Sequence, residues 1–241
     1  MPEFKKLILI GRPASGKSEL IDFLKNIPEN ERKEKFHIGK FYELDDFPWL
    51  WEKFTEDDIW EKAGHKRLCS KRAEHGYVTA DGSVLDYCIE RFNFEIKKQP
   101  TDGTTFIEFA RGAPDGGFGK ALNQFSDELL KDAAVLFIYT SYEESCRRNE
   151  ARYQEKLKHS ILAHKVPQED QIRFAKDIDW LEITNEKSSG YLPIRNFKIP
   201  FVTMNNEPEL KQDQTEALTK RYKTALDTLF QLCTRKQQEV S

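Results

Sequence analysis

The chain has 241 residues, of which 38% are hydrophobic, 33% charged and 12% aromatic, and this aromatic content is too high for a disordered protein. Its 38 basic and 41 acidic residues give a formal net charge of −3, which gives no reason to expect a nucleic-acid or anionic-membrane partner. No apolar run approaches the ~20 residues of a transmembrane helix, and the four cysteines lack the CxxC spacing of zinc sites. We therefore expect a globular, cytoplasmic protein without a signal peptide.

Short apolar segments alternate with segments of helical periodicity along the chain. Runs of β-branched, leucine and aromatic residues predict strands over residues 6–10, 36–44, 104–110, 133–139 and 201–204. Apolar residues at helical spacing predict helices over 18–27 and 84–97, after residue 119, over 143–158 and near the C-terminus. Residues 29–35 are strongly charged, so we expect them to form a solvated connection.

This alternation predicts a three-layer α/β/α sandwich with a parallel sheet of about five strands. Right-handed crossovers place the strand-to-helix loops at one sheet edge, where ligands bind. We expect a single domain over residues 1–241, with a helical, aromatic-rich flap at about 47–83 and a lid region at about 143–189. The flap contains Trp49, Trp51 and Trp60, which either stack on a ligand or form a small core; the core is the commoner role of such residues.

The strongest motif follows the first predicted strand. Residues 11–18, GRPASGKS, match the phosphate-loop pattern G-x-x-x-x-G-K-[ST] without a mismatch. Glycines let successive N–H groups point inward at phosphate oxygens, Lys17 offers a cation, and Ser18 offers a hydroxyl to Mg²⁺. The residues expected to bind the nucleotide are Gly11, Ala14, Ser15, Gly16, Lys17 and Ser18, and Lys17 is also expected to be catalytic.

These residues make the chain similar to the P-loop NTPase superfamily. The guanine motif N-K-x-D is absent, because the nearest segment reads NEKS at 185–188, and no LSGGQ signature occurs. Helicases and RecA-like motors place an acid at a strand end, whereas Glu108 lies inside the predicted strand. The N-terminal Walker A motif, the acidic pair at 45–46, the arginine-rich helix after the fourth strand and the closing FVTMNNEPEL segment resemble nucleoside, nucleotide and small-molecule kinases. The EFARG segment is also similar to uncharacterised kinase-like proteins.

The resemblance implies phosphoryl transfer from ATP, with Mg²⁺, to a small-molecule acceptor such as a nucleoside, a nucleotide or another metabolite. A different possibility is a nucleotide-binding switch or slow ATPase without an acceptor. The two readings differ in one feature, since only a kinase needs a concave, charged acceptor pocket between the flap and the glycine-rich loop at 111–119. The sequence determines neither the acceptor nor the oligomeric state.

Asp45 and Asp46 are expected at the carboxyl end of the second strand, facing the phosphate loop. One of them would accept the proton of the acceptor hydroxyl, and Asp45 would hold Mg²⁺ together with Ser18. The alternative is that this pair caps the following helix, as aspartates commonly do. Either residue of the pair can be the base.

Glu108 and Arg111 come from the third strand and are expected to bind the acceptor, because an acid in an apolar run is costly to bury without a partner. The structural alternative is an internal salt bridge between them. The glycine-rich loop that follows either presents backbone N–H groups to the acceptor or is simply flexible.

Arg148 and Arg152 are four residues apart on the predicted helix after the fourth strand and share one face. In the kinases that the chain resembles, lid arginines stabilise charge on the transferred group, so both are predicted to be catalytic. The alternative is a solvated helix on which they pair with neighbouring glutamates.

Overall fold

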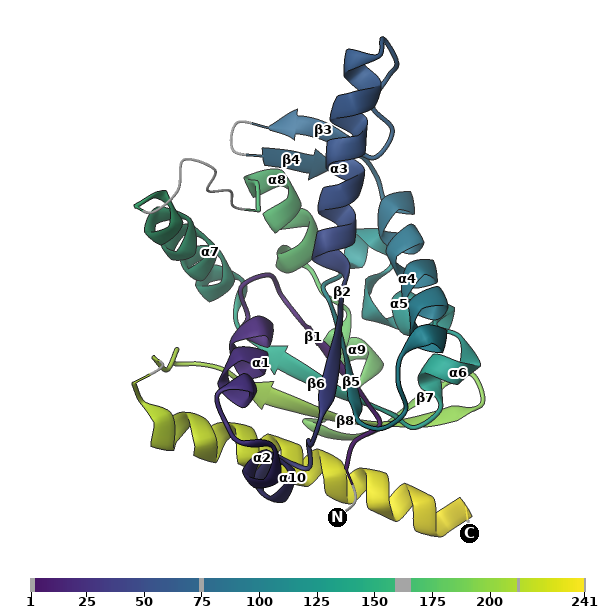
Figure 1. Cartoon of the computed structure of the whole chain (residues 1–241), viewed down its shortest axis with the longest axis vertical. Coiled ribbons are helices and arrows are strands. Elements are labelled where there is room, and N and C mark those ends of the chain that lie inside the picture. Colours follow the sequence, from purple (N-terminus) through teal and green to yellow (C-terminus); the bar gives the residue numbers. More distant parts are fainter. Residues whose placement is uncertain (1–2, 74–75, 159–165, 212, 241) are drawn as a thin grey trace.

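The computed structural model describes residues 3–73, 76–158, 166–211 and 213–240. Its central sheet has six strands in the order β2-β5-β1-β6-β8-β7, of which the first five are parallel and β7 runs antiparallel to β8 (Figure 1). The predicted parallel sheet is confirmed. The strands are β1 (Lys6–Gly11), β2 (Phe41–Asp45), β5 (Thr104–Phe109), β6 (Ala133–Tyr139), β7 (Ser189–Ile194) and β8 (Phe197–Asn205).

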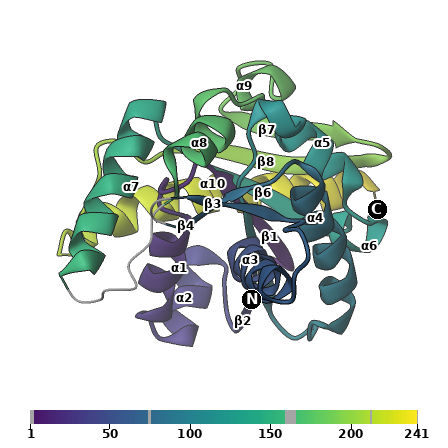
Figure 2. The same cartoon turned by 90° about the horizontal axis from the view of Figure 1, so that it is seen from above.

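Helices cover both faces of the sheet, which gives the predicted three layers (Figure 2). Successive residues of a strand point to opposite faces, so Leu7 and Leu9 pack on one layer and Ile8 and Ile10 on the other. The first layer contains α1 (Lys17–Lys25), α2 (Glu29–Phe36) and the long α10 (Thr215–Val240). The second contains α4 (Ser83–Glu95), α5 (Gly117–Gln124), α6 (Asp127–Leu130) and α9 (Trp180–Ile183).

A third group of elements stands beyond the carboxyl ends of the parallel strands (Figure 1). It consists of α3 (Asp46–Lys62), the hairpin of β3 (Ser70–Ala73) and β4 (Gly76–Thr79), α7 (Tyr142–Leu157), α8 (Gln168–Gln171) and a π-helical turn over Ile172–Lys176. A small core around Leu50, Phe54 and Phe174 joins α3 to α4 and the π-helical turn. Two 3₁₀ turns, Ile96–Lys98 and Ala113–Asp115, complete the described elements.

Several sequence-based boundaries were wrong. The charged segment 29–35 is helix α2, which ends at Phe36, and His37 then adopts a left-handed φ of 60°, so the strand predicted from residue 36 begins only at Phe41. The flap, expected to be helical, is one 17-residue helix followed by a β-hairpin. Strand β7 was missed because SGYLPI contains a glycine and a proline, which are unusual inside strands.

Part of the predicted lid, residues 159–165, lies outside the described residues. Within the described part of the chain, no helix combines the length and the apolar character needed to cross a membrane.

Candidate active site

The phosphate loop links β1 to α1 and is closely surrounded by backbone and side-chain atoms. Gly16 has a φ of 106°, which L side chains rarely adopt, and a Cβ atom there would lie 2.3 Å from Asn206 Nδ2. A Cβ at Gly11 would lie 2.5 Å from the carbonyl oxygen of Ile138 on the neighbouring strand. Both motif glycines are therefore required by space as well as by conformation.

Hydrogen bonds with segments distant in the sequence hold this loop in place. Asn206, after β8, donates from Nδ2 to the carbonyl of Ser15 over 2.8 Å, and Arg148 Nη2 donates to the carbonyl of Asn206 over 2.7 Å. Arg12, inside the loop, donates from Nη1 to the carbonyl of Thr140 over 2.7 Å and from Nε to the carbonyl of Ala175 over 2.5 Å. These bonds fix the loop between β6, β8 and the π-helical turn.

The position of Arg148 corrects the sequence-based prediction of a lid residue. Its side chain is 2% exposed, and it pairs with Glu144 over 2.7 Å while its guanidinium contacts the loop support at Asn206. Arg148 is absent from the walls of the main cavity, whereas Arg152, one turn further, lines that cavity. The two arginines therefore do different things: Arg148 supports the phosphate loop, and Arg152 faces the site.

Lys17, Ser18 and Glu108 meet at the start of α1. Lys17 Nζ donates to the carbonyls of Gly11 and Arg12 at 3.3 and 3.1 Å, and Ser18 Oγ donates to Glu108 Oε1 at 3.1 Å. Burial lowers the pKa of Lys17, an effect opposed by the nearby carboxylates, of which Glu108 is the strongest. Burial raises the pKa of Glu108 to about 7 although the Lys17 ammonium opposes this.

Glu108 was expected beside the acceptor and Asp45 beside Ser18, but the observed hydrogen bond of Ser18 is to Glu108. The register explains this, because Glu108 lies opposite Leu9 of β1 and Asp45 of β2, at the strand ends that precede the loop. Glu108 is near the end of β5, which stops one residue later at Phe109.

Asp45 and Asp46 occupy the junction of β2 and α3. Asp45 Oδ1 accepts from the N–H of Phe47 over 3.0 Å, so it does cap α3, and burial raises its pKa. Asp46 is buried and accepts from Arg111 Nη1 over 3.1 Å; burial raises its pKa to about 6, opposed by Arg111. The salt bridge of Arg111, given above as the structural alternative for Glu108, is formed with Asp46 instead. Both aspartates also line the cavity.

A cavity of about 320 Å³ opens beside the phosphate loop. One end is formed by Lys17, Ser18 and the carboxylates of Asp45, Asp46 and Glu108. Aromatic and apolar side chains from α3, β4, α7 and the segment after residue 165 also line the cavity: Phe47, Leu50, Trp51, Phe54, Tyr77, Tyr153, Val166 and Phe174. Its volume is within the range of small-molecule sites.

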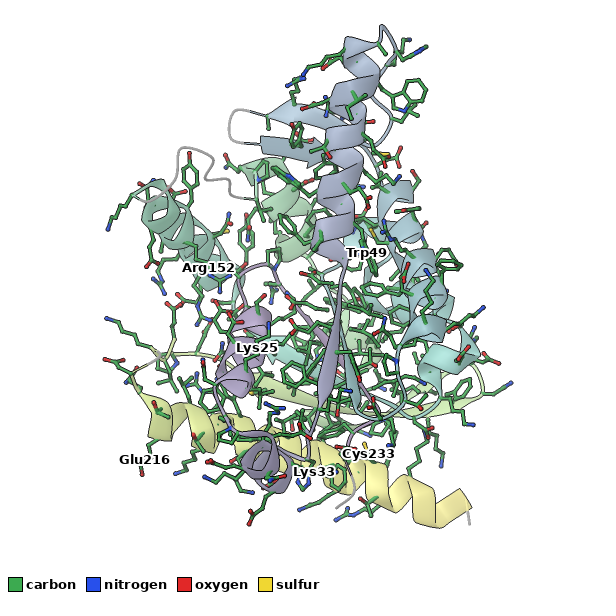
Figure 3. All side chains as sticks on the ribbon, in the orientation of Figure 1. Lys25, Lys33, Trp49, Arg152, Glu216 and Cys233 are labelled. Carbon is green, nitrogen blue, oxygen red and sulfur yellow. The ribbon has the colours of Figure 1, made fainter. Side chains whose placement is uncertain are left out.

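Figure 3 shows Arg152 on α7, on the side facing α1, and Trp49 near the base of α3. Arg152 forms an ion pair with Glu19 of α1 at the cavity wall. Trp49 packs edge-to-face on Phe92 of α4, as expected of a core residue. Trp51, by contrast, lines the cavity, and Trp60 is 48% exposed. The tryptophans of the flap thus have three different environments.

The glycine-rich loop at 111–119 does not offer its N–H groups to the cavity. The N–H groups of Phe118 and Gly119 donate to the carboxylate of Asp179, each over 2.8 Å. Asp115 is paired with Arg173, and a Cβ at Gly112 would overlap the carbonyl of Arg173. The glycines allow close packing against the π-helical turn, and only Arg111 of this loop lines the cavity.

Sequence reasoning missed Asn206, Arg12 and Asp170 as residues of the site region. Asn206 follows a predicted strand end, the position where ligand-side loops gather, and this signal could have found it. Arg12 occupies a variable position of the motif, and nothing in the local sequence marks Asp170.

The residues near Ser18 offer oxygen ligands of the kind Mg²⁺ prefers. Among the described residues, no group of three or more His, Cys, Asp or Glu side chains forms a metal-binding cluster. Mg²⁺ commonly takes one or two carboxylates together with substrate phosphates and water, and Ser18 and Glu108 are oxygen donors of that kind. The Ser15 Oγ, buried within the phosphate loop and without a hydrogen-bond partner in the described part of the chain, is a further polar atom available there.

Comparison with protein-family models and with curated proteins finds no match. Among solved structures, the chain is similar to a gluconokinase from Sinorhizobium meliloti, with 10% identity, a TM-score of 0.49 and 99% of each chain covered. It is also similar to shikimate kinase from Acinetobacter baumannii, with 16% identity, a TM-score of 0.38 and coverage of 90% of this chain and 89% of that one. The fold itself is decided by the sheet order around β1 and by the phosphate loop that follows it. The chain has a three-layer α/β/α fold with a phosphate loop after its first strand.

Proposed function

We propose that the protein transfers the γ-phosphoryl group of ATP, with Mg²⁺, to a hydroxyl of a small-molecule acceptor. One observation supports this over a non-transferring switch: the cavity is continuous from Lys17 and Ser18 to an aromatic pocket. A switch needs a nucleotide site but no adjoining space for a second molecule. The acceptor would bind between the phosphate loop, the flap and the segment after residue 165. Its hydroxyl would then lie next to the phosphates bound by the phosphate loop.

The acidic end of the cavity supplies groups for the chemical step. Ser18 and Glu108 are the residues that would hold Mg²⁺, which when bound would neutralise charge on the phosphates. Lys17 would bind the same phosphates as a point charge. The negative charge of Asp46 is already compensated by Arg111, so of the two aspartates Asp45 is the better general base for the acceptor hydroxyl. Its bond from Phe47 would keep the carboxylate oriented.

Arg152 would contact the transferring group, because it lines the cavity from α7. Its partner Glu19 would hold it until the phosphates compete for the guanidinium. The buried ion pair of Arg111 and Asp46 would form part of the lining that contacts the acceptor.

The proposal is tested first by nucleotide binding. Calorimetry with ATP and Mg²⁺ should show at least a hundredfold loss of affinity in Lys17→Ala, because charge-assisted contacts to phosphate are lost. Lys35→Ala is the matched control: this lysine pairs with Glu31 on the exposed face of α2 and should bind ATP like the parent. Equal affinity of Lys17→Ala and the parent would contradict the proposal.

Transfer is tested by ADP release from ATP in the presence of a panel of nucleosides, sugars and sugar acids. A kinase should release ADP in stoichiometric amounts with a phosphorylated product identified by mass spectrometry. Tight ATP binding with ADP release that no acceptor increases would favour the slow-ATPase alternative.

A further inference from the structure

Asp170, on α8, has a carboxylate that is only half satisfied. The residue is 3% exposed and lines the cavity. Its Oδ2 accepts two hydrogen bonds from Thr79 of β4, from the backbone N–H and from Oγ1, each over 3.0 Å. Its Oδ1 is buried and has no hydrogen-bond partner among the residues that the structure describes. A buried acceptor atom at a cavity wall points to a ligand that donates a hydrogen bond.

The neighbouring cation does not fill this role. Arg173, three residues further on, donates from Nε to Asp115 Oδ2 over 2.8 Å and from Nη1 to the carbonyl of Thr79 over 3.3 Å. Burial raises the pKa of Asp170 to about 6, with opposing contributions from the bonds of Thr79 and the charge of Arg173.

The walls around this carboxylate restrict the shape and polarity of the ligand. Trp51, Phe54, Tyr77 and Phe174 line the same cavity. A flat ring packs favourably on these four aromatic side chains, whereas a polyol in the same place would set hydroxyl groups against the rings and away from polar lining residues such as Asn149 and Arg152. The combination favours a flat, mostly apolar body with a polar donor at one edge.

We propose that Asp170 determines acceptor specificity by accepting, at Oδ1, a hydrogen bond from the exocyclic amino group of a flat nitrogen heterocycle that carries the phosphorylated hydroxyl on its other side. This inference rests on the proposed function for the placement of that hydroxyl at the phosphate loop. Binding of the heterocycle itself does not require ATP or transfer. The two can therefore be tested separately.

The test uses pairs of nucleosides whose edges are reversed: cytidine, with a 4-amino donor beside an N3 acceptor, against uridine, with a 4-oxo acceptor beside an N3–H donor, and adenosine against inosine, which are reversed in the same way at positions 6 and 1. Calorimetry without ATP should show that the parent binds the amino member of at least one pair about tenfold or more tightly, because an oxo group at the position of the amino group cannot donate to Oδ1 of Asp170.

Asp170→Asn should reverse this preference. The asparagine can keep its oxygen toward the two Thr79 donors and then presents an NH₂ donor to the cavity, so the oxo member becomes the better ligand. Glu169→Gln is the matched control: the neighbouring side chain is exposed, and the same loss of charge there should leave the preference unchanged. Circular dichroism and thermal unfolding show whether each variant is folded.

Failure to bind any of the four nucleosides at millimolar concentration, or equal affinity within both pairs in the parent, would overturn the assignment. An unchanged preference in a folded Asp170→Asn would do the same. If Asp170→Asn does not fold, the assignment is decided by whether the parent prefers the amino member of a pair. ADP release measured in parallel separates the two proposals: a nucleoside preference without transfer would refute only the kinase, and transfer to sugars alone would refute only the role of Asp170.

Discussion

Arg148 and Arg152 are one helical turn apart, and the structure predicts opposite consequences of replacing them with alanine. Arg148→Ala removes a buried guanidinium that bonds to the carbonyl of Asn206 and pairs with Glu144. Arg152→Ala removes a side chain that is 39% exposed and pairs with Glu19 at the cavity. The first change should therefore affect stability and the second should affect turnover.

The magnitudes follow from burial. Breaking a buried, hydrogen-bonded ion pair costs about 3–5 kcal/mol, and part of that cost is relieved here because Glu144 also binds the exposed Arg147 and is itself near the surface. We expect a loss of about 3 kcal/mol in the free energy of unfolding, which lowers Tm by about 6–12 °C in a chain of this size. A partly exposed ion pair contributes less than about 1 kcal/mol, so Arg152→Ala should change Tm by less than about 4 °C.

Turnover should show the reverse order once an acceptor is identified. Loss of a cation that stabilises the transferring group reduces turnover by about 10²–10³ with little change in ATP affinity, which is expected for Arg152→Ala. The assays are differential scanning calorimetry, ATP titration and initial rates, with the exposed Arg147→Ala as the control. Parental stability of Arg148→Ala would refute its role in supporting the loop, and parental turnover of Arg152→Ala would refute a contact with the transferring group.

Two further predictions concern the carboxylates. Asp45→Asn should keep the cap of α3 and the stability of the protein but lose at least about a hundredfold in turnover. Asp46→Asn should lower Tm, because Arg111 is left buried without its counter-charge. Similar stability of both variants in thermal unfolding would contradict this difference. The pKa of Glu108 rises from 4.5 to about 7 on folding, so between these pH values the folded state holds a proton that the unfolded state releases. The free energy of unfolding should therefore fall as pH rises across that interval. Glu108→Gln should weaken this dependence in denaturant titrations, and an unchanged pH profile would argue against the shift.

The fold was largely predictable because its signals are local. The apolar run before residue 11, the glycines of the loop and the helical spacing after Ser18 lie within one short segment, and together they predict the strand, the turn and the helix. Alternation of strands and helices then predicts a parallel sheet with two covered faces. Errors arose where local signals conflict with packing, as in the charged α2, whose Arg32 bonds to the carbonyls of Gly39 and Leu24.

The candidate site was predicted in its parts and not in its pairings. Asp45, Asp46, Glu108, Arg111 and Arg152 were all selected from the sequence, and all of them line the cavity. Their partners depend on register and on which side chains share a buried space. Ser18 therefore meets Glu108, Arg111 meets Asp46, and the N–H groups of the glycine-rich loop meet Asp179, which is about sixty residues away.

The sequence by itself determined the phosphate loop, because its conformation depends on glycines and on a motif that eight consecutive residues contain. Only the tertiary structure decided that Arg148 lies under this loop, that Asn206 binds it from after β8, and that Asp170 keeps a buried oxygen without a partner. The physical reason is that a hydrogen bond or an ion pair depends on distance in space, and residues more than a hundred positions apart acquire that distance only when the sheet and its covering layers have formed.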